Sequence, residues 1–278
     1  MSDAAAPPPI EPPVESQRPK RNWRGWLKEY AVIVIGVLTA LAAQQVAEWL
    51  HWRAQVKEAR EVIATELASN LAVAVTRLRT VSCTERRLNE LALILDTAAK
   101  NGSLPPVGDI GRPPRGTWPS GAWESVVASQ TATHFLRQPL ANIAAAYKLT
   151  ERVEQFSLRE IEDWNELYTM VGPGRRLDAA SESELRKALS EARTNNRTIA
   201  ALGLQVANLV KTLNLPFNRG DIERIELARH PPAYATPSEI CLPIGSAPSS
   251  YGHGALGSTD VNRPDAVQQF PEFSYDVH

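Results

Sequence analysis

An uncharged apolar segment near the N-terminus constrains this chain more than any other feature. It runs from Tyr30 to Ala47, 18 residues without a charged side chain. As an α-helix it would be about 27 Å long, close to the roughly 30 Å hydrocarbon core of a bilayer. Tryptophans flank it on both sides, as in the aromatic belts at membrane–water interfaces: Trp23, Trp26, Trp49 and Trp52. The pattern predicts a transmembrane helix over residues 26–50.

Two other interpretations of this segment stay open. A cleaved secretory signal would use residues 31–42 as its apolar region and Ala40-Leu41-Ala42 as its cleavage site. The region before it would then be about 30 residues long and rich in proline, unlike an ordinary signal. A buried helix of a soluble bundle would not need tryptophans at both ends. We therefore expect an uncleaved anchor in contact with the lipid bilayer.

The distribution of basic residues predicts how the anchor is oriented. Five lysines and arginines lie between positions 18 and 28, and three lie between positions 53 and 60. Positive charge is enriched on the cytoplasmic side of a span. We expect a bacterial inner-membrane protein with a disordered, proline-rich cytoplasmic arm over residues 1–25 and its remaining domains in the periplasm.

Small residues recur along one face of the expected span, at Gly36, Ala40, Ala43 and Ala47. Their spacings of 4, 3 and 4 place them on one stripe, where two helix backbones can approach closely. The stripe predicts a homodimer through the span. Alanine is also common in bacterial spans, so the stripe has an alternative, purely compositional explanation.

The chain after the span predicts an all-α fold. Neither proline nor glycine occurs from Val37 to Asn101, and apolar residues follow spacings of three, four or seven through this run. Coiled-coil pairing and packing against later helices predict the same stripe. Further helices are expected over residues 120–137, 139–171 and 181–215, after a loop over 101–120. Ser181 and Glu184 have the spacing of a capping box.

We thus expect a transmembrane helix that continues into a long helix of a bundle over residues 51–215. The tail, residues 216–278, contains eight prolines and six aromatic residues, and we expect it to be irregular. It would either pack partly on the bundle through its aromatic residues or stay undocked until it binds a partner.

The two cysteines, Cys83 and Cys241, are candidates for one disulfide if the domain is periplasmic. Cys83 is about 200° around the helix from Val81, a residue of the apolar stripe, so we expect it to point outward, where the tail can reach it. Two unrelated thiols, or a bridge between two copies of Cys83, are the alternatives.

The sequence contains no pattern that predicts catalysis, a cofactor or a metal. The segment "GHGALG", residues 252–257, fits a dinucleotide fingerprint but lacks the strand and the helix that the fingerprint requires. The acidic residues of "EIEDW", Glu160 to Trp164, are expected to form a solvated helix face. A formal net charge of -1 gives no indication of nucleic-acid binding. We expect a protein that is not an enzyme.

The start of the chain resembles an uncharacterised class of bacterial single-pass membrane proteins. The similarity rests on Glu29, the span residues Ile33 to Leu41, Trp49 and the step formed by Glu66, Leu67 and Asn70. The segment "AWESVVAS" around Trp123 and the helix near Tyr147 extend it. The resemblance implies an anchored helical domain and assigns no catalytic residue.

These observations favour a non-catalytic interaction or scaffold module with an unknown protein partner. One alternative is a ligand-sensing bundle whose small molecule sits near Trp123, Tyr147 and Trp164. Another is a cytoplasmic scaffold, if the orientation is reversed.

Overall fold

The structure is a computed structural model that describes residues 23–233 and 235–246. The chain forms two compact units, Met1–His51 and Trp52–His278. In the first unit the described residues belong to α1 (Trp23–Asn101), and their apolar side chains are exposed except for the half-buried Val34. An 18-residue window here has a mean hydropathy of 1.8 and no buried residue. Among the described helices, this one is long and apolar enough to span a membrane.

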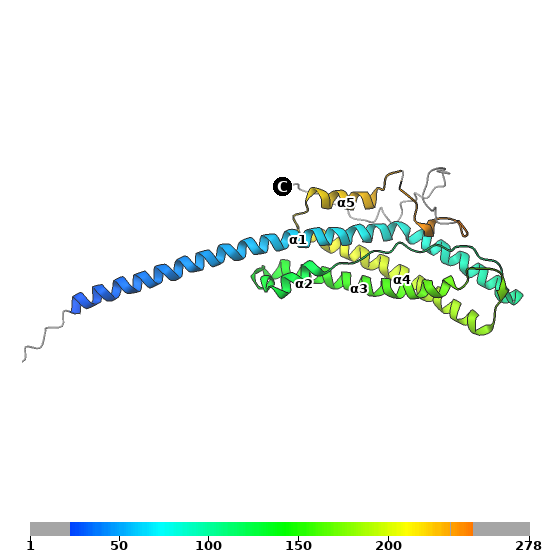
Figure 1. The fold of residues 1–278 in the computed structure, drawn as a ribbon, viewed down its shortest axis with the longest axis horizontal. Helices are drawn as coiled ribbons and strands as arrows, with labels where there is room; N and C mark the ends of the chain where they lie inside the picture. Colours follow the sequence, from blue (N-terminus) through cyan, green and yellow to red (C-terminus); the bar gives the residue numbers. More distant parts are fainter. Residues whose placement is uncertain (1–22, 234, 247–278) are drawn as a thin grey trace, which may run out of the picture. The chain divides into compact units, whose positions relative to one another are not determined.

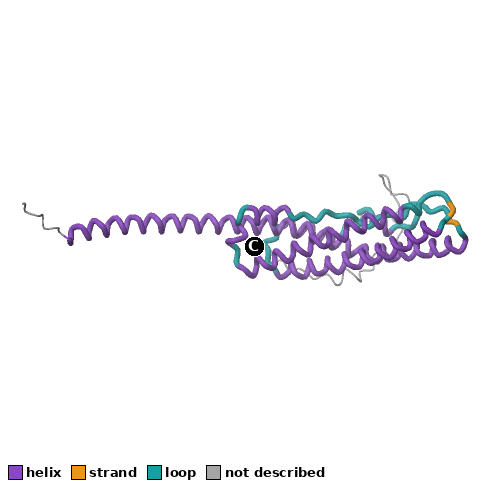
Figure 2. The backbone as a smooth tube through the Cα atoms, turned by 90° about the horizontal axis from the view of Figure 1, so that it is seen from below, coloured by secondary structure: helices purple, strands orange, loops and turns teal. Residues whose placement is uncertain are grey.

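The second unit is a helical bundle built around the rest of α1 (Figure 1). The other helices are α2 (Gly121–Ala128), η1 (Thr131–His134), α3 (Arg137–Tyr168), α4 (Ala179–Thr212), α5 (Arg219–Arg229) and η2 (Glu239–Cys241). Two short antiparallel strands, β1 (Ser103–Leu104) and β2 (Arg175–Arg176), pair at one end of this unit (Figure 2). The fold is therefore all-α, as the sequence predicts.

The apolar stripe of α1 supplies the centre of the bundle. Ile63, Leu67 and Leu71 lie in a first core with residues of α2, α3, α4 and α5. Leu88 and Leu95 lie in a second core with residues of α3, α4, the loop after α1 and the tail at η2. Later helices of the same chain thus cover this stripe.

A buried polar layer separates the two cores, and the sequence pattern did not predict it. On α1 the buried positions between Leu78 and Leu88 are Thr80, Cys83, Thr84 and Arg87, while Val81 is only half-buried. On α4 the layer continues with Asn195 and Asn196. The amide of Asn195 donates to Asp163 Oδ2 of α3 at 2.7 Å.

Several helices begin or end at other residues than expected, and at the start of α4 the reason is a capping residue. The segment expected as one helix over 120–137 is divided into α2 and η1, and α3 begins at its last residue, Arg137. The expected capping box at Ser181 is wrong: α4 begins earlier, because the Asp178 carboxylate caps it by accepting from the Ser181 backbone N–H at 2.8 Å. Asp is among the strongest N-cap residues.

The segment expected to be irregular contains α5, which packs on α1. Asn218 and Asp221 form a reciprocal capping box at its start. Ile225 is fully buried in the first core, and Thr65 of α1 donates to Asp221 Oδ2 at 3.2 Å. The tail is thus docked on the bundle as far as it is described. Five of its six aromatic residues, Tyr234 and the four beyond residue 246, lie outside the described part, as does the whole of "GHGALG".

Candidate functional site

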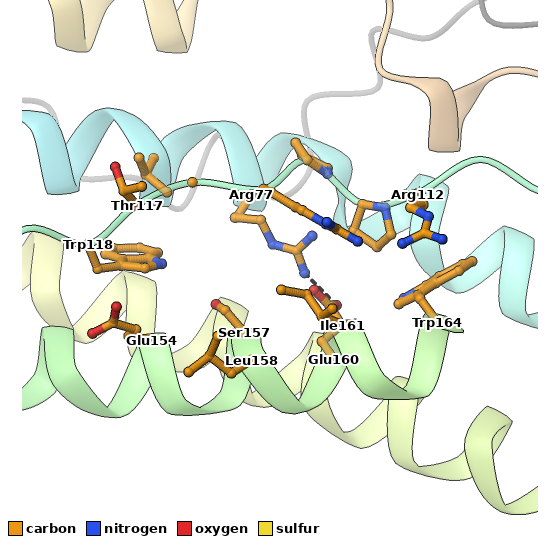
Figure 3. A pocket seen from close by; sticks show the side chains of 15 residues that line it. Arg77, Arg112, Thr117, Trp118, Glu154, Ser157, Leu158, Glu160, Ile161 and Trp164 are labelled. Atoms are coloured by element: carbon orange, nitrogen blue, oxygen red, sulfur yellow. Dashed lines mark hydrogen bonds and ion pairs between the residues drawn. The ribbon is translucent and has the colours of Figure 1, made fainter. Parts of the chain in front are cut away.

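A pocket of about 190 Å³ lies between α1, α3 and the loop segment 112–118 (Figure 3). We call residues 112–118 the strap and this hollow the strap pocket. From α1 it is lined by Val73 and Arg77. From α3 it is lined by Glu154, Ser157, Leu158, Glu160, Ile161 and Trp164. Trp118 and Trp164 lie at its two ends.

The C-terminal half of the strap is held tightly against α1. A Cβ built on Gly116 would lie only 2.2 Å from Val73 Cγ1, so glycine is required for this close approach. Trp118 is buried in the first core, and Asn70 of α1 donates to the carbonyl of Pro119 at 3.1 Å. The end of the strap is therefore fixed by backbone proximity, by burial and by a hydrogen bond.

The beginning of the strap is held by polar contacts with α3. Arg112 donates to Asn165 Oδ1 at 3.0 Å, and its guanidinium lies 4.1 Å from the centre of the Tyr168 ring. The Tyr168 hydroxyl donates to Asp109 Oδ1 at 2.8 Å, and the backbone N–H of Gly111 donates to the same oxygen. Both ends of the strap are thus anchored, and the strap forms a wall of the pocket.

A buried ion pair crosses the pocket from α1 to α3. Arg77 Nη2 donates to Glu160 Oε1 at 2.7 Å, and both side chains are less than a tenth exposed. The expected solvated acidic face is therefore wrong for Glu160 and for Asp163, which are both buried. Arg77 offsets the charge of Glu160, and the neutral amide of Asn195 donates a hydrogen bond to Asp163. Both partners are distant in the sequence, and no local pattern predicts them.

Burial also shifts the acidity of these carboxyls. It raises the pKa of Glu160; the nearby Arg77 opposes the shift by its charge and hydrogen bond, and Asp163 adds to it. Burial likewise raises the pKa of Asp163, with the Asn195 hydrogen bond in opposition.

Three buried hydrogen-bond donors of residues that line the strap pocket have no partner among the described residues. Within the described part of the chain, Arg77 Nε and Nη1 are buried without a partner, and so is Trp164 Nε1. A buried donor without a partner costs about 1–3 kcal/mol, and more when it is charged. Three unpartnered nitrogens around one hollow are suited to holding a molecule with acceptor atoms.

Cys83 and Cys241 are joined in a disulfide that links α1 to the tail across 158 residues. The expectation that Cys83 points outward is wrong in detail: it is buried in the second core, because the tail covers this face of α1. Ile240, next to the bond, is fully buried in the same core.

Two arginines on α1 hold the same region of the tail. Arg86 Nη2 donates to the carbonyl of Cys241 at 3.0 Å. The buried Arg87 donates to the carbonyls of Leu242 and Ile110. The tail and the loop that leads into the strap are therefore fixed together on α1 beside the disulfide.

The expected residues of the span occupy an exposed helix surface. Gly36, Ala40, Ala43 and Ala47 are all exposed, and a Cβ on Gly36 would meet nothing within 4 Å. Of the expected interface tryptophans, Trp23, Trp26 and Trp49 are exposed. Trp52 instead packs in the second unit, where its ring stacks on His134 at 3.8 Å.

The three aromatics expected to border one ligand do not share a site. Trp123 and Tyr147 stack at 5.6 Å against the first core, whereas Trp164 lies in the second core and lines the strap pocket. The Tyr147 hydroxyl donates to Glu66 Oε1 at 2.7 Å; burial and this hydrogen bond raise its pKa. Sequence analysis also missed Arg77: it lies about 100° round the helix from Leu78 of the apolar stripe, and no local pattern marks it as buried.

Within residues 23–233 and 235–246, no three His, Cys, Asp or Glu side chains gather to hold a metal ion. No protein-family model matches the chain, and no similar curated protein or solved structure was found.

Proposed function

We propose that this chain is a single-pass inner-membrane protein that presents a helical bundle in the periplasm and acts there through contacts rather than catalysis. The observation that carries the proposal is the Cys83–Cys241 disulfide. Disulfides persist in oxidising compartments and are rare in the cytosol. The exposed apolar surface of α1 before residue 52 supports the membrane anchor, since such a surface is stable in lipid.

The orientation can be tested by fusing two reporters to separate copies of the C-terminus. Alkaline phosphatase folds to an active enzyme only after export, whereas a suitable fluorescent protein matures only in the cytoplasm. We expect active phosphatase and no fluorescence. In parallel, a maleimide reagent should label neither cysteine of the denatured protein until a reductant is added. A fluorescent fusion with both thiols labelled would disprove the periplasmic orientation.

We further propose that the chain self-associates through the small-residue stripe of the span. The double variant Gly36→Ile/Ala40→Ile places bulk where two backbones would meet and should convert a detergent-solubilised dimer to a monomer. Ala31→Ile/Ala42→Ile is the matched control, since these alanines lie about 150° and about 130° from the centre of the stripe. An unchanged oligomeric state in the first variant would exclude this interface.

A second candidate function is the sensing of a small ligand by the bundle. The unpartnered donors of Arg77 and Trp164 in the strap pocket favour it over a purely structural role. A signal from such a site would pass to a protein partner in or beneath the membrane.

A further inference from the structure

We propose that the strap pocket binds a small organic monocarboxylate whose apolar body is about the size of one aromatic ring. The proposal rests on the ligand-sensing function and names its ligand class.

The donors in the pocket define the polar end of the ligand. Arg77 approaches from α1 and Trp164 from α3, and their unpartnered nitrogens are all N–H donors. A ligand must therefore offer acceptor atoms without needing to donate. A carboxylate meets this requirement, because its two oxygens accept several hydrogen bonds and its charge strengthens each one.

The charges around the pocket favour an anion. Its lining includes three arginines, Arg77, Arg112 and Arg115, against two glutamates, Glu154 and Glu160. Glu154 and Arg115 are both exposed, so water screens their charges. The less exposed charged groups are Arg77 and Arg112 against Glu160. Arg77 is nearly buried, so its interaction with an incoming anion is screened far less.

The remaining lining defines the apolar end and the size of the ligand. Val73, Pro113, Pro114, Trp118 and Ile161 contribute apolar surface. The volume is about 190 Å³. A protein cavity of roughly 150 Å³ holds benzene, so this hollow is suited to a ring with one carboxylate.

Benzoate is a suitable probe for this site, and binding can be measured by calorimetry on the full chain in nanodiscs, with empty nanodiscs as reference. We expect saturable binding with a Kd of about 1 mM or tighter. Benzyl alcohol, which retains the ring without the charge, should bind at least about tenfold more weakly. Inorganic phosphate, an anion without an apolar body, should not displace benzoate.

Two variants test the donors. Arg77→Lys keeps a cation for Glu160 but removes the unpartnered Nε and Nη1, and it should weaken benzoate binding by about tenfold or more. Arg79→Lys is the matched control, because Arg79 lies on the same helix but donates to Ala228 instead of lining the pocket. Trp164→Phe removes the indole N–H together with part of the buried ring, and it should weaken benzoate binding by about tenfold.

The possible outcomes are decisive. Absence of benzoate binding up to about 10 mM would overturn the proposal. If benzyl alcohol binds as tightly as benzoate, the pocket recognises the apolar ring and not the carboxylate. If phosphate displaces benzoate, the pocket recognises the anionic charge and not the ring. Either result rejects the proposed ligand class. If Arg77→Lys does not fold, as judged by circular dichroism, the test rests on Trp164→Phe. Binding of benzoate by Trp164→Phe with wild-type affinity would show that the indole N–H does not hold the ligand.

These results are independent of the proposed topology. Benzoate binding is measured on purified protein, whichever side of the membrane the bundle occupies in the cell. Failure of the reporter fusions would therefore leave the ligand proposal standing, and failure of benzoate binding would leave the anchored interaction module standing.

Discussion

Opening the Cys83–Cys241 disulfide should remove much of the stability of the second unit. The bond closes a loop with a sequence separation of 158. On the chain-entropy relation, a closed loop of this length stabilises the folded state by about 5 kcal/mol. Folded domains are stable by roughly 5–15 kcal/mol in total. The two cores and the hydrogen bonds of Arg86 and Arg87 to the tail remain, so we expect a folded but marginal bundle.

The measurement compares three samples of the full chain by urea unfolding and circular dichroism: oxidised wild type, reduced wild type and the double variant Cys83→Ser/Cys241→Ser. The free energy of unfolding should fall by about 5 kcal/mol in both samples without the bond. The slope with urea should rise, because an unlinked denatured chain exposes more surface.

Comparing the free energy of unfolding of the two samples without the disulfide tests whether loop closure is the cause of the stabilisation. Reduced wild type retains both sulfur atoms in the core, whereas the double variant replaces them with hydroxyls. Equal losses mean that loop closure supplies the stability. A loss below about 1 kcal/mol in both would refute the chain-entropy argument, since it would mean that the denatured chain keeps these segments together without the bond.

Three further predictions concern the bundle. Tyr147→Phe deletes the hydrogen bond to Glu66 and should lower the free energy of unfolding by about 1.5–3 kcal/mol in urea titrations; no change would mean that the bond adds no net stability. Gly116→Ala should cost about 1–3 kcal/mol through the clash with Val73, and Val73→Ala in the same chain should recover much of this; additive losses would contradict the clash. Burial raises the pKa of Asp163, so the folded state binds the proton of this carboxyl more tightly than the unfolded state does. The stability that protonated Asp163 contributes should therefore decline as pH rises from about 4. Asp163→Asn should flatten the profile of unfolding free energy against pH, and an unchanged profile would show that Asp163 does not cause the decline.

Helix content was predictable because its signals are local. Ile63, Leu67 and Leu71 recur at helical spacing, and any arrangement that buries one of them buries all three. The helix starts were less predictable, although the caps are local as well. Asp178 was overlooked in favour of Ser181, and α5 was missed because its capping box uses Asp221 in place of the usual Glu or Gln.

The polar interior was not predictable in the same way. Glu160 was expected in solvent, because a charged helix residue is usually exposed. Its partner Arg77 lies 83 residues earlier, and only the packing of α1 against α3 brings the two charges together.

The sequence by itself determined the membrane-length apolar segment, the helical class and the two cysteines available for a bond. These properties follow from residue type and short-range spacing, which act before any tertiary contact forms. Tertiary structure alone decided that Cys83 faces a docked tail, that a polar layer divides the core and that the strap encloses a pocket between Val73 and Trp164. Such features depend on groups far apart in the chain, whose burial is stable only when the complementary partner arrives from another helix.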